Sequence, residues 1–207
     1  MKRPSKSMDA GSFLLATPAL NDTYFKDCIV FLVEFCPPMS AWGLVLNHTV
    51  HMPLDEVFNR DPKSNVILQR PLHTFFFGGP EHGTSPFQEL TITILETNKT
   101  AFEKAPHDPN YADRTHSFYG KSYEIKPGVF IYQVPPGTPL PVSQLTAPAN
   151  STTRIFFGYA DWLGAKLEAD VNEGLWEVSN VPPVKIFAQS REKTILTPSI
   201  FREIYSA

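Results

Sequence analysis

Apolar residues gather in short, nearly continuous runs along this chain. Each run is rich in Ile, Val, Leu or Phe and is bounded by turn residues, a pattern typical of strands buried on both faces. Four of these runs are Phe13–Thr17, Cys28–Phe35, Ala41–Asn47 and Arg154–Tyr159. A similar run that ends at Gly78-Gly79-Pro80 is His73–Phe77. Together these runs predict a strand-rich core.

Further segments predict strands of other kinds. In Glu89–Glu96 apolar residues alternate with threonines, which predicts a strand with one face in solvent. Two more candidates, Ser122–Lys126 and Val129–Val134, are separated by the turn signal Pro127-Gly128. This spacing predicts two short strands with a turn between them.

The strongest helical pattern runs from Leu163 to about Gly174. Leu163, Leu167 and Val171 recur every four residues and are expected to face the core. The residues expected on the solvent side are Lys166, Glu168, Asp170 and Asn172.

Two shorter helices are predicted from the positions of prolines. Pro53–Arg60 begins with a first-turn proline and carries acidic residues near its positive end. The last helix is expected to begin with Thr197 as its cap and Pro198 at its first position. Its core-facing residues are expected to be Ile200, Phe201 and Ile204.

Composition adds a large share of loops to this picture. The chain has 207 residues, 42% of them hydrophobic, which is enough for one domain with its own core. Its 20 prolines are about twice the usual share and favour short strands and many loops. We expect residues 1–11 to be a flexible N-terminal segment and residues 12–207 to be a single domain. Irregular loops are expected near 97–121 and 134–153.

Charge and cysteine content bound the partners and the compartment. The 18 basic residues are outnumbered by 21 acidic ones, which disfavours direct nucleic-acid binding because that binding needs a basic face. Cys28 opens an apolar run, where a buried thiol is favoured over a disulfide to Cys36. No apolar run reaches the length of a signal peptide core or of a membrane span. We therefore expect a cytoplasmic protein with no membrane partner.

The sequence holds no recognisable catalytic motif. The nucleophile elbow Gly-x-Ser-x-Gly is absent, and Ser190-x-x-Lys193 lacks the companion motifs of serine–lysine enzymes. His48 and His51 follow a strand and precede a proline, and no metal-binding spacing accompanies them. Loop histidines in solvent are the favoured interpretation. We predict no catalytic residue, no metal site and no cofactor.

Three segments at strand ends are candidates either for a binding site or for structural turns. Gly78-Gly79-Pro80 lacks the helix start or lysine of a phosphate cradle, and Glu81 repels phosphate, so a tight turn with positive φ is favoured. Gly158-Tyr159-Ala160-Asp161-Trp162 precedes the strongest helix; Asp161 can cap that helix, and the aromatic residues can line a pocket or fill the core. Asn47 can satisfy turn backbone groups or present its amide to a ligand.

Taken in order, these segments resemble a known family. Four motifs carry the resemblance: Pro18-Ala19-Leu20-Asn21-Asp22 with Phe25, Gly43-Leu44-Val45-Leu46-Asn47, Gly78-Gly79-Pro80, and Gly158-Tyr159-Ala160-Asp161-Trp162 with Leu167-Glu168 and Trp176. Their order and rough spacing are similar to those of the AlgH/YqgE family of bacterial proteins. The resemblance covers about Ser12–Leu95 and Arg154–Glu177.

The resemblance implies an α+β fold. In that fold a mostly antiparallel, bent sheet closes toward a pseudo-barrel, with a few helices packed outside. The name AlgH implies a link to transcriptional regulation. This chain departs from the family at Ala165-Lys166, where the family has Gly-Gln, and after Pro80, where the common Asp-Arg-Gly-Phe is missing. If those positions bind something in the family, this chain is expected to bind it differently or not at all.

The leading functional hypothesis is a non-enzymatic protein that binds a small molecule or a protein partner and has a regulatory role. The candidate ligand-binding residues are Asn47, Gly78, Gly79, Tyr159 and Trp162. One alternative is an enzyme of unknown class that uses Asp22, Asp161, Glu168 or a histidine as acid or base. A second alternative is a regulator that contacts DNA directly, which the acidic balance disfavours.

Overall fold

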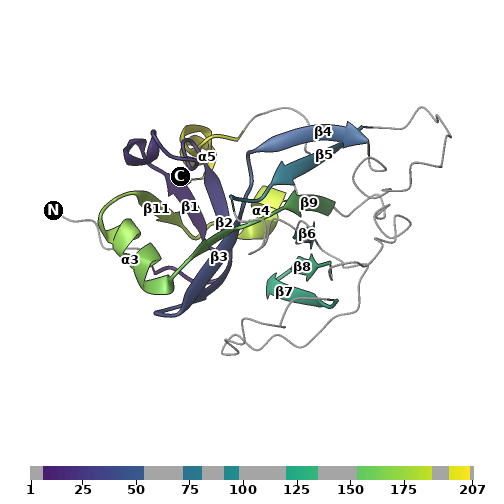
Figure 1. The fold of residues 1–207 in the computed structure, drawn as a ribbon, viewed down its shortest axis with the longest axis horizontal. Coiled ribbons are helices and arrows are strands. Elements are labelled where there is room, and N and C mark those ends of the chain that lie inside the picture. Colours follow the sequence, from purple (N-terminus) through teal and green to yellow (C-terminus); the bar gives the residue numbers. More distant parts are fainter. Residues whose placement is uncertain are drawn as a thin grey trace.

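The computed structural model describes residues 7–53, 72–80, 91–97, 120–134, 153–187 and 196–205. Its strands form two sheets, and the pairing is antiparallel except between β5 and β9 (Figure 1). The five-stranded sheet has the order β10 (Ala160–Trp162), β3 (Ser40–Val45), β2 (Ile29–Cys36), β1 (Phe13–Ala16) and β11 (Trp176–Ser179). The six-stranded sheet has the order β4 (Thr49–Pro53), β5 (Leu72–Phe77), β9 (Thr153–Phe157), β6 (Ile92–Thr97), β8 (Val129–Gln133) and β7 (Ser122–Lys126). The predicted α+β class and the mostly antiparallel pairing are confirmed.

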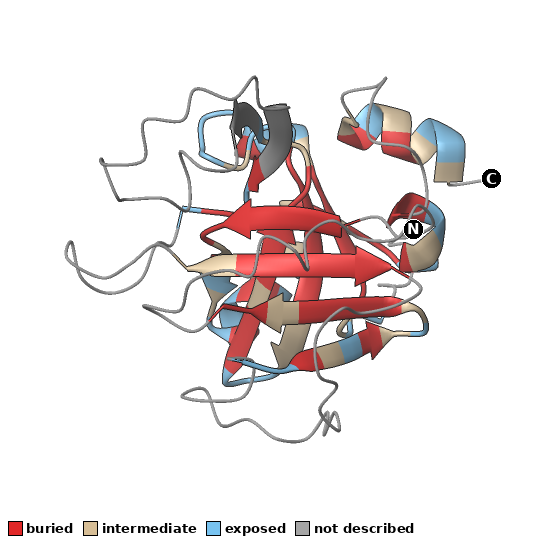
Figure 2. Ribbon diagram, turned by 90° about the vertical axis from the view of Figure 1, so that its right-hand side faces the viewer, coloured by how far each residue is buried: buried red, intermediate tan, exposed pale blue. Residues whose placement is uncertain are grey.

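The five-stranded sheet is buried on both faces, as its apolar runs predicted. In β1, Phe13 and Leu15 enter a core cluster shared with the six-stranded sheet, while Leu14 and Ala16 enter a second cluster on the opposite face. Helix α3 (Gly164–Asn172) covers the second cluster with its fully buried Leu167. Because successive side chains of a strand point to opposite faces, a sheet covered on both sides needs continuous apolar runs. The strands of the six-stranded sheet lie toward the viewer in Figure 2, and those whose burial is described are largely in the colour of buried residues as well.

Strand β6 is buried on both faces, which corrects the prediction of one solvent face. Thr93 is 0% exposed and Glu96 only 2%. The face predicted to meet solvent is the one that carries Thr93 and Leu95, and it is turned toward the core between the sheets. Leu95 enters the core cluster between the sheets, and Ile94 on the other face is equally buried. Residues 89–90 of the predicted strand lie outside the described residues.

The two sheets meet at a corner formed by Gly78. Its carbonyl oxygen accepts a hydrogen bond from Val45 N in β3 (2.7 Å), and its N–H donates to the carbonyl oxygen of Phe157 in β9 (2.7 Å). Gly158 then takes a φ of +69°, and the chain leaves β9 to pair β10 with β3. The run Arg154–Tyr159, predicted as one strand, therefore breaks at Gly158. The single bent sheet closing toward a pseudo-barrel is likewise corrected, because the described strands form two sheets and no closed barrel.

Helix α3 spans the predicted residues but presents different faces. Leu163 precedes the helix in an extended conformation and is 64% exposed. No side chain caps the helix, so Asp161 is not its cap. The residues that face the sheet are spaced by three: Gly164, Leu167 and Asp170. Asp170, expected in solvent, is only 6% exposed and forms an ion pair with Lys166.

The last helix, α5 (Pro198–Tyr205), begins as predicted. The hydroxyl oxygen of Thr197 accepts a hydrogen bond from Ile200 N (3.3 Å), and Phe201 is fully buried. Ile204 was expected in the core but is 51% exposed. The residues that α5 buries are Pro198 and Phe201.

Short helices and the segments between strands complete the fold. The pattern analysis did not predict η1 (Pro18–Leu20) or α4 (Pro183–Phe187), which buries Ile186 and Phe187 in the shared core cluster. Of the helix predicted at Pro53–Arg60, Pro53 ends β4 and the remainder lies outside the described residues. The loops predicted near 97–121 and 134–153 also lie largely outside them. Among the helices that the structure describes, none is long and apolar enough to cross a bilayer.

Residues 7–11 lie along the edge of the domain. Gly11 N donates to the carbonyl oxygen of Leu32 (2.7 Å), and Asn180 Nδ2 donates to the carbonyl oxygen of Ser7 (2.9 Å). Asp9 forms an ion pair with Lys126 at 2.8 Å. These contacts connect the segment before β1 to both sheets.

Candidate functional site

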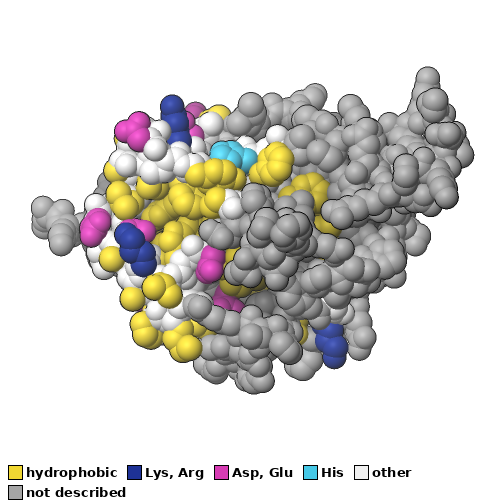
Figure 3. Space-filling model, viewed as in Figure 1, with side chains coloured by type: hydrophobic (Ala, Val, Ile, Leu, Met, Phe, Trp, Pro, Cys, Tyr) yellow, Lys and Arg dark blue, Asp and Glu magenta, His cyan; other side chains and the backbone are white. Residues whose placement is uncertain are grey.

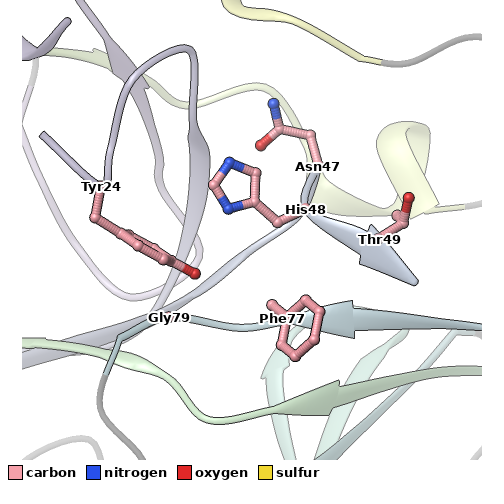
Figure 4. Close-up of a pocket in the computed structure, with 6 residues that line it drawn as sticks. All are labelled: Tyr24, Asn47, His48, Thr49, Phe77 and Gly79. Atoms are coloured by element: carbon pink, nitrogen blue, oxygen red, sulfur yellow. The ribbon is translucent and has the colours of Figure 1, made fainter. Parts of the chain in front are cut away.

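A cavity of about 510 Å³ opens beside the junction of the two sheets. It lies between the loop before β2, the start of β4 and the end of β5. Its lining residues are Tyr24, Asn47, His48, Thr49, Phe77 and Gly79. Figure 4 shows the rings of Tyr24, His48 and Phe77 around a common space. Among the described residues that line it, none is a lysine, arginine, aspartate or glutamate.

His48 is the polar centre of this cavity. Its Nε2 lies 3.4 Å from the Cys28 sulfur, and its ring meets the Tyr24 ring edge-on with centroids 5.3 Å apart. Burial lowers the pKa of His48 below its ordinary value of 6.5. The imidazole is therefore neutral at pH 7, with one nitrogen that accepts a hydrogen bond and one that donates.

Cys28 supports His48 from behind the cavity. The residue is 0% exposed, and burial, together with the charge of Asp27, raises the pKa of its thiol to about 12. The thiol also donates to the carbonyl oxygen of Tyr24 at 3.5 Å. A buried, protonated thiol is neither accessible nor nucleophilic. The neighbouring cysteine and histidine therefore do not form a catalytic pair in this structure.

The amide of Asn47 is occupied by the backbone. Its Oδ1 accepts a hydrogen bond from Ile29 N (3.0 Å), and its Nδ2 donates to the carbonyl oxygen of Asp27 (2.7 Å). Asp27 has a φ of +55°, which is rare for a residue other than glycine. Of the two roles considered for Asn47, the structure shows the first: its side chain secures the turn that leads into β2 while its edge lines the cavity.

The two glycines at the end of β5 allow backbones to cross closely. A Cβ on Gly78 would overlap the carbonyl oxygen of Gly158, and one on Gly79 would overlap the backbone of Tyr159 and Ala160. Both glycines are buried. The structure thus gives a different reason for this pair from the tight turn predicted: a side chain at either position would separate the two sheets.

The other two predicted binding residues lie away from the cavity lining. Tyr159 packs beside the shared core cluster and meets Trp42 edge-on, with ring centroids 6.0 Å apart. Trp162 stacks on Phe25 at 5.6 Å and meets Trp176 edge-on at 6.1 Å. Of the five predicted residues, the structure brings Asn47 and Gly79 into the cavity lining, with Gly78 adjacent in the chain. A binding role for Tyr159 or Trp162 stays a prediction.

Sequence reasoning missed three lining residues that matter most. Tyr24, His48 and Phe77 each stand next to a residue that the motifs singled out, namely Phe25, Asn47 and Gly78. For His48 and Phe77 the position at a strand end was the available signal. What sequence could not show is that three separate loop and strand ends converge on one space.

The acids considered for catalysis lie outside the cavity lining. Asp22, Asp161 and Glu168 are all exposed, and none lines the cavity. Within the described ranges, no group of three or more histidine, cysteine, aspartate or glutamate side chains is arranged to hold a metal ion. Figure 3 shows hydrophobic side chains spread over the left half of the visible face, with a histidine at their upper edge.

Comparison with known proteins gives consistent relatives. The DUF179 family model, described as AlgH-like, matches residues 13–196. A UPF0301 protein of Chlamydia muridarum is 27% identical over 194 residues, covering 93% of this chain and 85% of that protein. A UPF0301 protein of Thermobifida fusca is 26% identical over 168 residues, covering 81% of this chain and 74% of that protein.

Two solved structures are similar in fold. The solution structure of the AlgH protein from Pseudomonas aeruginosa has a TM-score of 0.54 at 20% identity, covering 90% of this chain and 85% of that one. An X-ray structure of a Corynebacterium diphtheriae protein has a TM-score of 0.58 at 16% identity, covering 97% of this chain and 90% of that one. At such identities the likeness supports the fold alone. The resemblance inferred from the motifs is confirmed by the family match, and the chain belongs to the AlgH-like family.

Proposed function

We propose that this chain is a non-enzymatic binding protein that holds a small, neutral ligand in the cavity beside His48. One observation carries the proposal: two aromatic side chains, Tyr24 and Phe77, remain 42% and 41% exposed while lining the same cavity. Aromatic surface of this kind gains free energy when a ligand covers it. The volume of about 510 Å³ also lies in the range of small-molecule sites.

The chemistry of the lining favours binding over catalysis. General acid–base catalysis needs groups that exchange protons near neutral pH and that reach the same reacting atom. Burial and the nearby Cys28 raise the pKa of Tyr24, and burial lowers that of His48, so both are neutral at pH 7. The described lining residues therefore do not offer a pair of groups that both exchange protons near neutral pH.

A regulatory role is the finer part of this proposal. It is suggested by the AlgH name of the family, and it requires that ligand occupancy alter contact with a partner. We also propose a reducing compartment, the cytoplasm, because Cys28 and Cys36 are free thiols. Direct DNA contact is not part of the proposal, since the net charge of the chain is −3.

The test is a thermal-shift screen against nucleosides, free bases, amino acids, small aromatic compounds and divalent metals. A ligand at 100 times its Kd adds about 2.7 kcal/mol of stability, or roughly 5–10 °C in Tm for a domain of this size. Tyr24→Leu and Phe77→Leu should abolish the shift, while Ile204→Ala, an exposed apolar residue on α5, should keep it. Silence across the screen, or an equal shift in all three variants, would overturn the proposal.

A further inference from the structure

The contacts around Cys28 assign the proton of His48. The thiol keeps its single proton, and the carbonyl oxygen of Tyr24, 3.5 Å from the sulfur, can only accept it. His48 Nε2 lies 3.4 Å from the same sulfur. With the thiol proton directed at the carbonyl, the contact is favourable when Nε2 carries the N–H and donates to sulfur. A neutral imidazole has one N–H, so Nδ1 is then a bare acceptor.

That acceptor faces the cavity. Figure 4 shows one ring nitrogen of His48 directed toward the space that Tyr24 and Phe77 flank, and the other directed away from it. Because Nε2 is the nitrogen beside Cys28, the nitrogen on the cavity side is Nδ1. Within the described residues Nδ1 has no hydrogen-bond partner in the protein. An acceptor that faces the cavity and has no partner among the described residues is available to a ligand that donates a hydrogen bond.

The geometry points to a ligand class: we propose that the cavity takes a flat, neutral heteroaromatic ring whose ring N–H donates to His48 Nδ1. The ring faces lie against the exposed aromatic surfaces of Tyr24 and Phe77. The described part of the lining carries no lysine, arginine, aspartate or glutamate, which favours a neutral ring over a charged one. This inference rests on the proposed function, and it makes Cys28 a positioning residue that acts only through His48.

Protonation of His48 removes the acceptor. The titratable groups that face its ring from the described elements are Tyr24, on the loop before β2, and Cys28, at the start of β2. Asp27 adds its charge to the surroundings of Cys28. Burial holds the pKa of His48 below 6.5, so the acceptor is present at neutral pH. As the pH falls through that pKa, both ring nitrogens carry protons and a donating ligand loses its partner.

The first experiment compares indole with 1-methylindole by calorimetric titration at pH 8. The two probes share shape and neutrality, but methylation removes the ring N–H. We expect indole to bind at least tenfold more tightly. Indole affinity should also fall roughly tenfold per pH unit below the pKa of His48, while the affinity of 1-methylindole changes little. Equal affinities for the two probes overturn this inference. If the thermal-shift screen finds other ligands but indole does not bind, the ligand class is wrong and the proposed function stands.

The second experiment reads the proton directly. Nitrogen-15 NMR of the native protein should place the N–H of His48 on Nε2, and a proton on Nδ1 overturns the inference whatever the variants do. Cys28→Ala should mix the tautomers and weaken indole several-fold, and Cys28→Ser, which can still accept and donate, should restore both. Cys36→Ala, at the far end of β2, is the matched control and should change neither.

Discussion

Tyr24 and Phe25 are neighbours in the chain, yet they belong to two different aromatic groups. Phe25 stacks on Trp162 at 5.6 Å and meets Trp176 edge-on at 5.3 Å. Tyr24 meets the ring of His48 at 5.3 Å and is 42% exposed. We call Phe25, Trp162 and Trp176 the tryptophan cluster. It covers the outer face of the five-stranded sheet, whereas the His48 cavity opens at the junction of the two sheets.

The difference shows what separates aromatic residues that fill the core from aromatic residues that leave a cavity open. In the tryptophan cluster every ring contacts the other two, and Trp176 is only 3% exposed. In the cavity the rings of Tyr24 and Phe77 leave a space that no described side chain fills. The residue type is the same in both groups. An aromatic residue in a motif therefore predicts a binding site only when the residues that it contacts in the folded chain are known.

The largest effect is expected from Trp176→Ala. Removal of a fully buried tryptophan should lower the free energy of unfolding by about 3–5 kcal/mol, measured by urea denaturation. Trp162→Ala should cost less because this ring is only partly buried. Tyr24→Leu, at the cavity, should stay within about 1 kcal/mol of the native protein. A Trp176→Ala variant as stable as Tyr24→Leu would mean that the tryptophan cluster contributes little to folding.

Asn47→Ala tests a residue that lies on the cavity but is expected to stabilise the fold. Although Asn47 lines the cavity, its amide bonds the backbone of Ile29 and Asp27. Its loss should cost about 1–3 kcal/mol, because the part-buried N–H of Ile29 loses its acceptor and the turn at Asp27 loses its donor. Asn47→Asp keeps an acceptor for Ile29 N and should cost less. Thr49→Ala, which also lines the cavity, should change the urea midpoint little. An Asn47→Ala midpoint equal to that of Thr49→Ala would contradict the structural role.

The sequence predicted the strands well because burial on both faces leaves an unbroken apolar run. Phe13–Thr17 and Cys28–Phe35 nearly coincide with β1 and β2. It failed where tertiary packing overrides the local pattern. Thr93 is polar yet buried because it shares a face of β6 with Leu95 of the core cluster, and Asp170 is charged yet buried on the inner face of α3.

The candidate site was predictable only in part. The glycines after β5 and the end of β3 were found as motifs, since such residues mark chain crossings and strand ends. The sequence could not show that Tyr24 lies beside these segments, because η1 and the loop after it carry no periodic pattern that places Tyr24 next to His48. These segments come together because the two sheets meet at the corner near Gly78, and no local sequence pattern predicts that corner.

The smallest effect, and the one most specific to the cavity, is a dependence of stability on pH. Burial lowers the pKa of His48 in the folded state below its ordinary value of 6.5. Between these two pKa values the unfolded chain binds a proton that the folded chain does not, so stability falls as the pH drops below about 6.5 and levels off below the folded pKa. The free energy of unfolding of the native protein and of His48→Gln is measured by urea denaturation across this pH range. The difference between the two isolates His48, because the other titrating groups contribute equally to both. The tryptophan cluster holds no titrating ring, so Trp162→Ala should keep the native pH slope. A native slope equal to that of His48→Gln would show that His48 has the same pKa in the folded and the unfolded chain, which would contradict the burial of its imidazole beside Cys28.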